Sequence, residues 1–530
     1  MHEEIKIEQE QLPSSLKDPN SYPYKPGQIQ LLQTHISYIA IAPPYVYKIK
    51  KPVNLGFLDF TTLQKRRHFC QREVELNRRL CRDVYEGVVA ISELNGKIMI
   101  EEARKIAEYA VKMKQLDEDG FLNKRLQENH IRPQDLDRLV QFLSRFYLKQ
   151  KSSPEIAECG FIHNIKATIE ENFAQTKRFA GDLIEDYAFE AIQEYNEQFF
   201  CRNAYLLNRR RNEGHILDCH GDLRLEHIHF SPNEVRIFDC IEFNDQFRYI
   251  DVANEIAFLT MDLDFHGRRD LSCYFSGQMA ESLDDPDMLS LLDFYKCYRA
   301  YVRAKVHSLK SIEPEVPQEQ KEKSRNNAGR LYQLALEYGI SGSAPMIIVV
   351  MGRIGTGKST IAERLSSSLG WEVLSSDATR KQLAGIPLTS RPDEAGREKI
   401  YSKEMTEKTY DALLEKCAEY AGQGKSCLID ATFGSQKRRS KLRNALKSRN
   451  IRFNFIELTA TDETVKKRLS ERKISNNNIS DARIEDYDKL NSNYHSPNSL
   501  ELNSHIIADT GQPLKDTLFD ILKRIIQMKP

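Results

Sequence analysis

Short apolar runs alternate with amphipathic segments over the last third of the chain. Strands are predicted at 346–351, 371–375, 426–431, 451–459 and 504–508, and helices at 358–369, 394–422, 436–449, 462–472, 481–491 and 513–527. Strands that alternate with helices in this way are typical of a parallel sheet that carries helices on both faces. The pattern therefore predicts an α/β domain with a parallel doubly wound sheet.

The first 340 residues are patterned differently. β-forming residues dominate 29–51, and Asn95-Gly96 is a hairpin turn signal. Helical periodicity fills roughly 133–210 and 252–338, and two short apolar strands lie between these regions, within 228–238. Strands followed by helices, without regular alternation, predict an α+β domain.

The stretch 339–345, GISGSAP, is rich in glycine and serine and lies directly before the first strand of the α/β pattern. A chain of 530 residues is too long for a single hydrophobic core. We therefore predict a first domain at 1–340, a linker at 341–345 and a second domain at 346–530.

Charge and composition limit the partners of the chain. Lys+Arg and Asp+Glu both number 77, so nucleic acid is a less favoured partner than a small molecule or a nucleotide. The sequence contains no run of 18 apolar residues, which predicts no membrane span, and its acidic N-terminus is unlike a signal peptide. The 10 cysteines form no C-x-x-C pair, which indicates reduced thiols. These features predict a cytoplasmic protein and leave its oligomeric state open.

A phosphate-binding loop is indicated directly after the strand at 346–351. The stretch GRIGTGKST fits the pattern G-x-x-x-x-G-K-[ST] between a strand and a helix. Glycines let backbone N–H groups converge on phosphate oxygens, and the start of the helix adds a positive dipole end. Lys358 can bridge the β- and γ-phosphates of ATP, and the Ser359 hydroxyl can ligate Mg²⁺. The predicted nucleotide-binding residues are Gly352, Arg353, Ile354, Gly355, Thr356, Gly357, Lys358, Ser359 and Thr360.

The later strands end in residues that suit phosphoryl transfer. The carboxyl ends of parallel strands face the ligand, so we expect Asp377 near the γ-phosphate, where it could accept the proton of an acceptor hydroxyl. Arg380 could hold that acceptor, and Asp430 could position Mg²⁺. Arg468 and Arg472 share a helix face before the polar stretch SNNNISDAR, which is typical of a lid that brings arginines onto phosphates. Each residue also has a structural alternative, as a helix cap, a turn cap or a solvated charge.

Residues 346–530 resemble the P-loop small-molecule and polynucleotide kinase group, which includes chloramphenicol phosphotransferase, zeta toxin, gluconate kinase and polynucleotide kinase. The matching stretches are GRIGTGKST, SSDATR, LIDATF and RLSER. The resemblance implies that Asp377 acts as a base toward a hydroxyl group, with ATP and Mg²⁺ as cofactors. The acceptor pocket differs among the members of the group, so the resemblance does not identify the acceptor.

The motif HGD at 220–222, followed by Asp239, resembles the catalytic core of the aminoglycoside phosphotransferase, or protein-kinase-like, fold. The resemblance implies a first domain of two lobes. It also implies that Asp222 orients or deprotonates an acceptor hydroxyl and that Asp239 holds Mg²⁺ on ATP. Lys48 would contact the phosphates, with Glu73 as its ion-pair partner.

Position 227 departs from that family, which has an asparagine five residues after the catalytic aspartate, where this chain has His227. An imidazole is a poor Mg²⁺ ligand beside an amide or carboxylate oxygen. The early hairpin THISYIAIAPP also lacks the glycines that would cover phosphates. As a whole, the chain resembles bacterial two-domain proteins in which an aminoglycoside phosphotransferase-like domain is fused to an ATP-binding P-loop domain, through VYKIKKPVNLGFLDF, HGDLRLEHI, FDCIEFND and YRAYVRAKV.

Three functions follow from these patterns. The first is an ATP-dependent phosphotransferase whose P-loop domain transfers the γ-phosphate to a hydroxyl of a small molecule or nucleotide. The second is an ATP-binding regulatory protein whose first domain binds a ligand without catalysis. The third is a polynucleotide 5′-hydroxyl kinase, which the zero net charge disfavours.

Overall fold

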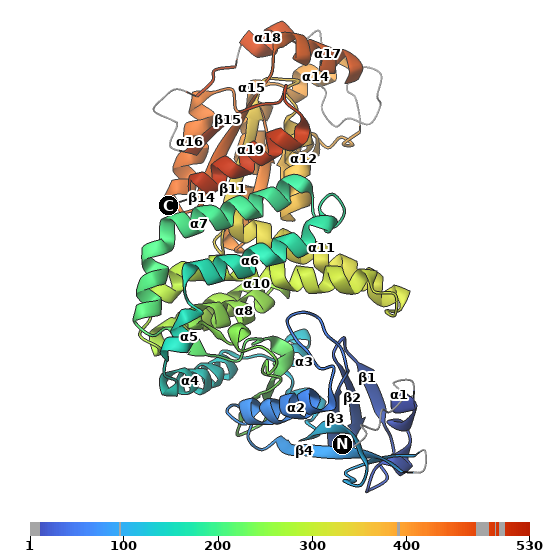
Figure 1. Ribbon diagram of the computed structural model, residues 1–530. Coiled ribbons are helices and arrows are strands. Elements are labelled where there is room, and N and C mark those ends of the chain that lie inside the picture. The colour runs from blue at the N-terminus through green and yellow to red at the C-terminus, as the bar shows by residue number, and fades with distance from the viewer. Residues whose placement is uncertain are drawn as a thin grey trace. The chain divides into compact units, whose positions relative to one another are not determined.

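The computed structural model describes residues 11–94, 97–389, 393–472, 487–492, 494–497 and 504–529 (Figure 1). The predicted turn at Asn95-Gly96 and the predicted lid sequence SNNNISDAR lie outside these residues. Packing divides the chain into two compact units, which are described separately. Unit 1 comprises Met1–Lys166 and Tyr205–Leu292, and unit 2 comprises Ala167–Ala204 and Asp293–Pro530.

A five-stranded parallel sheet forms the centre of unit 2. Its strand order is β12 (Glu372–Ser375), β13 (Cys427–Asp430), β11 (Met346–Gly352), β14 (Arg452–Thr459) and β15 (His505–Asp509). The first strand along the chain lies in the middle, and the later strands are added on both sides of it. This order confirms the predicted parallel doubly wound sheet.

Helices connect these strands and cover both faces of the sheet. α15 and α16 pack on one face, where Val349, Ile429 and Phe455 share an apolar core with Leu413 and Leu446. α12 contacts β11 and β13, and α19 contacts β15 from the side that faces the viewer in Figure 1. The helices are α12 (Lys358–Leu369), α13 (Ser376–Leu383), α14 (Glu394–Ile400), α15 (Lys403–Gly422), α16 (Gln436–Ser448), α17 (Asp462–Arg472), α18 (Tyr487–Ser492) and α19 (Leu514–Gln527).

Residues 167–204 and 293–340 group with the P-loop strands, whereas the sequence pattern predicted a single boundary at the linker. α11 (Gln318–Ile340) packs on α12 and α19. Trp371 Nε1 donates a hydrogen bond to Glu337 Oε1 at 3.0 Å within this contact. In the earlier segment the hydroxyl of Tyr187 makes a 2.6 Å hydrogen bond with that of Ser368 in α12. Packing between residues far apart in the sequence leaves no mark on local composition, so only the glycine-rich stretch was visible as a break.

A six-stranded antiparallel sheet begins unit 1. Its order is β1 (Gln30–Gln33), β2 (Ser37–Ala42), β3 (Tyr45–Lys50), β6 (Ile106–Lys114), β4 (Tyr85–Leu94) and β5 (Lys97–Ile100). α2 (Leu63–Asn77) packs against β4 and β6. Alternate residues of a strand share a face, so the side chains of Lys48 and Lys50 in β3 lie on the same face of the sheet.

The rest of unit 1 is mainly helical, with two small two-stranded sheets, β7 with β10 and β8 with β9. The long helical regions and the two short strands between them agree with the sequence pattern. The strands are β7 (Ile216–Asp218), β8 (Ile228–Phe230), β9 (Val235–Ile237) and β10 (Tyr249–Asp251). Besides α2 and α11, the described α-helices outside the P-loop region, in both units, are α1 (Gln11–Ser15), α3 (Leu122–Gln127), α4 (Pro133–Lys149), α5 (Pro154–Glu158), α6 (Ile162–Thr176), α7 (Asp186–Asn212), α8 (Val252–Phe265), α9 (Arg269–Ser282) and α10 (Asp287–Ile312).

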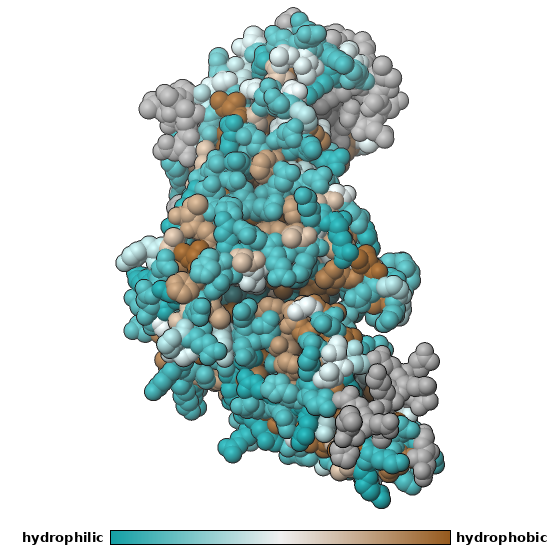
Figure 2. Space-filling model, in the orientation of Figure 1, coloured by the Kyte–Doolittle hydropathy of each residue, from teal (hydrophilic) through white to brown (hydrophobic). Residues whose placement is uncertain are grey.

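The hydropathy of the surface (Figure 2) and the absence of disulfides among the described cysteines both fit the composition of the chain. Among the helices that the structure describes, none has the length and apolar character needed to cross a membrane. Figure 2 shows mostly hydrophilic residues on the visible face, with scattered apolar ones. All 10 cysteines lie in the described residues, and none of them forms a disulfide there, while their reduced state stays a prediction.

Candidate functional site

The phosphate loop connects β11 to α12. Gly352 and Gly355 have left-handed backbone conformations, with φ of 142° and 74°. A Cβ atom at Gly352 would lie 2.5 Å from the carbonyl oxygen of Leu458, and one at Gly355 would lie 2.7 Å from Val465 Cγ1. The two glycines therefore allow both the backbone conformation and the close approach of β14 and α17. α12 begins at Lys358, so its first N–H groups face the loop.

Lys358, Ser359 and Asp430 lie together at the carboxyl end of the sheet. The Ser359 hydroxyl donates a hydrogen bond to Asp430 Oδ2 at 2.7 Å. Lys358 Nζ donates to the carbonyl oxygen of Arg353 at 2.8 Å, so its side chain folds back over the loop. Burial raises the pKa of the Asp430 carboxyl, while the charge of Lys358 and the hydrogen bond from Ser359 oppose that shift. An ammonium group and two oxygen atoms are thus brought to one place.

Asp377 and Arg380 lie on α13, next to that group. Asp377 Oδ1 accepts a hydrogen bond from Arg380 NH1 at 2.8 Å. The Arg380 guanidinium also lies 4.5 Å from the centroid of the Tyr401 ring. Its Nε atom is buried and has no hydrogen-bond partner among the described residues. Asp377 carries a side chain that is 25% exposed, and its charge acts on Asp430, so the two carboxylates are within electrostatic range of each other.

Thr510 supports the loop, and sequence reasoning missed it. Its hydroxyl donates a hydrogen bond to the carbonyl oxygen of Thr356 at 2.9 Å and accepts one from Arg468 NH1 at 2.9 Å. Arg468, which the sequence placed in a lid, is thereby tied to the end of β15 in this structure. The only signal for Thr510 was its place just after a predicted strand, on the side where ligands bind. Arg472 ends α17, and its role stays a prediction.

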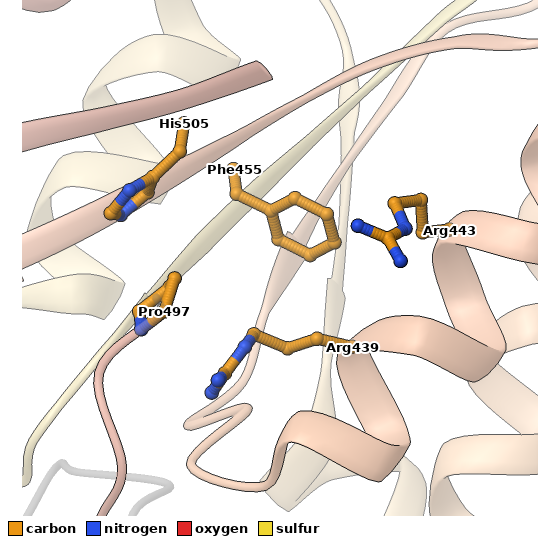
Figure 3. Close-up of a pocket in the computed structure, with 5 residues that line it drawn as sticks. All are labelled: Arg439, Arg443, Phe455, Pro497 and His505. Atoms are coloured by element: carbon orange, nitrogen blue, oxygen red, sulfur yellow. The ribbon is translucent and has the colours of Figure 1, made fainter. Parts of the chain in front are cut away.

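A small pocket lies between α16, β14 and β15 (Figure 3). Its volume is about 10 Å³, which is roughly the room that one water molecule needs. Figure 3 shows the ring of Phe455 between His505 and Arg443. Arg439, which also lines it, donates hydrogen bonds to the carbonyl oxygens of Phe433 at 2.8 Å and His495 at 2.7 Å. The pocket is too small for a nucleotide, and Arg439 anchors the segment 494–497 through its hydrogen bond to His495.

In unit 1, ion pairs join β3, α2 and the segment after β9. Lys48 Nζ lies 2.9 Å from Glu73 Oε1 and 2.5 Å from Asp239 Oδ1. Lys50 Nζ lies 2.7 Å from Glu73 Oε2 and also contacts Glu242. Burial disfavours the charge of Glu73, but the two lysines hold the pKa of its carboxyl below its ordinary value. The structure thus brings Lys48, Glu73 and Asp239 together and adds Lys50 and Glu242, which were not among the predicted site residues.

The HGD motif of unit 1 is held by an arginine. Arg224 Nε and NH2 donate hydrogen bonds to Oδ1 and Oδ2 of Asp222, at 2.8 Å and 3.0 Å. This forked pair engages both oxygens of the carboxylate. His220 is buried, its Nε2 lies 2.9 Å from the carbonyl oxygen of Phe238, and burial lowers the pKa of its imidazole to about 3.

Known proteins match both the P-loop region and most of the chain. Residues 347–497 match the family model described as an AAA domain, AAA_33. The uncharacterized protein Rv2004c of Mycobacterium tuberculosis is 30% identical over 412 residues, which cover 78% of this chain and 80% of the relative. The uncharacterized protein Mb2027c of Mycobacterium bovis matches with the same identity and the same coverage.

Solved structures match a smaller part of the chain. A gluconokinase from Sinorhizobium meliloti is 17% identical, covers 35% of this chain and 93% of its own, and has a TM-score of 0.26. The Mycobacterium tuberculosis APS kinase CysC, in complex with AMPPNP and APS, is 16% identical, covers 35% of this chain and 98% of its own, and has a TM-score of 0.27.

Replacing Thr510 tests its support of the phosphate loop. In Thr510→Val the carbonyl oxygen of Thr356 and the guanidinium of Arg468 lose a buried partner, which costs about 1–3 kcal/mol and should weaken ATP binding roughly 5- to 150-fold. Isothermal titration calorimetry with ATP measures this change. Thr517→Val is the matched control, because Thr517 is also buried but, within the described part of the chain, bonds the carbonyl oxygens of Asp509 and Pro513 and not the loop. Equal affinities in both variants would contradict the role of Thr510.

The buried His220 should make unit 1 sensitive to acid. Its pKa is about 3 in the folded chain and about 6.5 when exposed, so between these values the unfolded chain binds more protons. The free energy of unfolding should therefore fall as the pH drops below about 6.5, by up to about 1.4 kcal/mol per pH unit from this residue. Urea unfolding of His220→Gln should show a shallower loss between pH 6.5 and pH 5 than the unaltered chain. His130→Gln, at an exposed histidine, should keep the original slope; identical slopes in all three chains would refute the assignment.

Proposed function

The chain belongs to the same family as the two mycobacterial relatives, and we propose that it is an ATP-dependent phosphotransferase. Its P-loop unit would transfer the γ-phosphate of ATP to a hydroxyl group of a small molecule or nucleotide. The relatives are described as uncharacterized, so the proposal rests on the residues of this chain.

One observation carries the proposal: a second carboxylate lies beside the phosphate loop. Asp377 follows β12, and Ser375 of that strand is level with Asp430 in β13. Asp377 and Lys358 both act on the charge of Asp430. In phosphoryl transfer the enzyme mainly positions the reactants and stabilises charge, and a carboxylate near the γ-phosphate can take the proton of the attacking hydroxyl. We assign that role to Asp377, whose charge acts on Asp430 beside the loop.

Arg380 gives the acceptor side a second feature. Its guanidinium is fixed by the Asp377 carboxylate on one side and by the Tyr401 ring on the other. A buried N–H group without a partner costs free energy, and the Nε atom of Arg380 is such a group among the described residues. An oxygen atom of the bound acceptor would relieve that cost. Arg380 would therefore hold the acceptor while Asp377 receives its proton.

Ser359 and Asp430 fit Mg²⁺. Mg²⁺ takes oxygen ligands at about 2.0–2.1 Å in octahedral geometry, which places neighbouring ligands about 3 Å apart. Ser359 Oγ and Asp430 Oδ2 are 2.7 Å apart, so a small movement would let both face one ion. When bound with ATP, the ion would neutralise charge on the phosphates.

A second candidate function concerns unit 1, where the pairing of Asp222 with Arg224 favours nucleotide binding without phosphoryl transfer. Arg224 donates to both oxygens of Asp222, and these two hydrogen bonds compete with the transfer of a proton to the carboxylate. Lys48 and Asp239 remain as groups that can meet a nucleotide. We infer that unit 1 binds nucleotide without turning it over.

Replacing Asp377 tests the phosphotransferase proposal. Asp377→Asn should lower the rate of transfer by about 10²- to 10⁴-fold, because it removes a general base, and should leave ATP affinity unchanged. Incubation with γ-labelled ATP and a metabolite extract, followed by chromatography of the labelled products, measures transfer. Asp411→Asn is the control, since Asp411 is a half-exposed aspartate paired with Lys441. Transfer at the original rate in Asp377→Asn would rule out its role, and no labelled product with the unaltered chain would rule out the proposed reaction.

Replacing Lys358 separates the two units in the intact chain. Lys358→Ala should remove nucleotide binding at the loop, because the ammonium group no longer meets the phosphates. We expect equilibrium dialysis to show remaining nucleotide binding, and a phosphate-release assay to show no turnover. Turnover that persists in Lys358→Ala and disappears on adding Asp222→Asn would show that unit 1 is itself a catalyst.

A further inference from the structure

His227 and Asp239 face each other in unit 1 without a hydrogen bond between them. His227 Nε2 lies 3.5 Å from Asp239 Oδ2, beyond the roughly 2.7–3.2 Å of an N–H···O hydrogen bond. The other oxygen of Asp239 is engaged by Lys48. The His227 side chain is only 8% exposed, whereas that of Asp239 is 42% exposed, so an ion can reach the carboxylate from solvent.

The neighbours of His227 decide which nitrogen carries its lone pair. Nδ1 lies 2.8 Å from the backbone carbonyl oxygen of Asp222. A carbonyl oxygen can only accept, so Nδ1 carries the proton. On the other side, Arg224 NH2 lies 3.4 Å from Nε2, and a guanidinium can only donate. Both contacts assign the lone pair to Nε2, which faces Arg224 as well as Asp239, so a bound ion would replace the long contact with Arg224. This arrangement, with Nδ1–H on a backbone carbonyl, is the one in which histidines bind metals.

The distance between the two atoms suits a shared ion. Two ligands that each lie about 2.1 Å from one metal ion, at angles of roughly 90–110°, are about 3.0–3.4 Å apart. The observed 3.5 Å between Nε2 and Oδ2 needs only a small movement to reach that range. A lone pair and a carboxylate oxygen repel each other at this distance, and a cation between them would remove the repulsion.

The charges around the pair also favour a cation. Lys48, Lys50 and Arg224 are the basic groups of this network, and they share it with a larger number of carboxylates. These carboxylates belong to Glu73, Asp222, Glu226, Asp239 and Glu242. A nucleotide would bring more negative charge, so its binding needs a cation that joins it to the protein.

We propose that His227 Nε2 and Asp239 Oδ2 form part of a site for a divalent transition-metal ion, such as Mn²⁺, in preference to Mg²⁺. A neutral imidazole suits transition metals, whereas Mg²⁺ takes oxygen ligands. Among the described residues no group of three or more His, Cys, Asp or Glu side chains gathers as a metal site. The pair therefore supplies one nitrogen and one oxygen, and water and nucleotide phosphate oxygens complete the coordination.

Pulsed electron paramagnetic resonance of bound Mn²⁺ tests this directly. The sample is the full chain carrying Lys358→Ala, which removes nucleotide binding at the phosphate loop, with Mn²⁺ and a non-hydrolysable ATP analogue. We expect modulation from a ¹⁴N nucleus, because an imidazole nitrogen is bound to the ion. A spectrum of bound Mn²⁺ without ¹⁴N coupling would overturn the proposal, and this result needs no change at His227.

Substitutions assign the signal and the preference for the ion. His227→Asn in the same background should abolish the ¹⁴N coupling, weaken Mn²⁺ binding about tenfold or more, and reduce the preference for Mn²⁺ over Mg²⁺ in competition titrations. The matched control is His266→Asn, because His266 also lies near an aspartate, 3.9 Å from Asp262, but on an exposed helix turn. The control should keep the coupling and the affinity. Equal Mn²⁺ affinity and coupling in His227→Asn and the control would refute the role of His227.

Discussion

The hydrogen bond between Ser359 and Asp430 sets the geometry on which the P-loop unit depends. It joins the first turn of α12 to the end of β13, and it forms only because β11 and β13 are parallel neighbours with Val350 level with Asp430. A buried carboxylate is costly unless it is hydrogen-bonded or paired. The loop conformation, the central position of β11 and the acidic end of β13 are therefore parts of one arrangement, and altering any of them leaves Asp430 without its partner.

Buried charge imposes a similar constraint on unit 1, where ion pairs with lysines, in place of a serine hydrogen bond, stabilise the buried carboxylates. Lys48 and Lys50 point from β3 toward α2, where Glu73 accepts both, and each lysine has a further carboxylate from the segment after β9. Lys48 and Asp239 are 191 residues apart in the sequence. Removing one partner would leave a buried charge uncompensated, which destabilises a protein far more than the loss of a surface pair. The network thus fixes the distance between β3 and α2, which sets the space available to any ligand of this site.

The sequence predicted most of the strands and helices of the P-loop region after residue 346, but only the components of unit 1. The phosphate loop was visible because its strand, glycines and helix are contiguous, so local chemistry determines it. Thr510 supports the same loop from 154 residues away, and no local pattern marks it. In unit 1 the family resemblance implied the pair Lys48 and Glu73, but the choice of Arg224 to pair with Asp222 depends on side-chain conformations. The glycine-rich stretch marks a break in the sequence, but composition records no long-range contact such as the packing of α11 on α12 and α19.

The phosphate loop and the site in unit 1 also differ in the lysine contacts that a bound phosphate would have to replace. At the loop, Lys358 contacts a backbone carbonyl oxygen, so an anion that arrives there replaces a dipole with a charge and gains electrostatic energy directly. In unit 1, Lys48 already contacts Glu73 and Asp239, so an anion competes with carboxylates for the same ammonium group. Binding there is favourable only if a cation first draws Asp239 away or bridges it to the phosphates. The identity of that cation therefore controls occupancy in unit 1, whereas at the loop the preformed N–H groups already attract the anion.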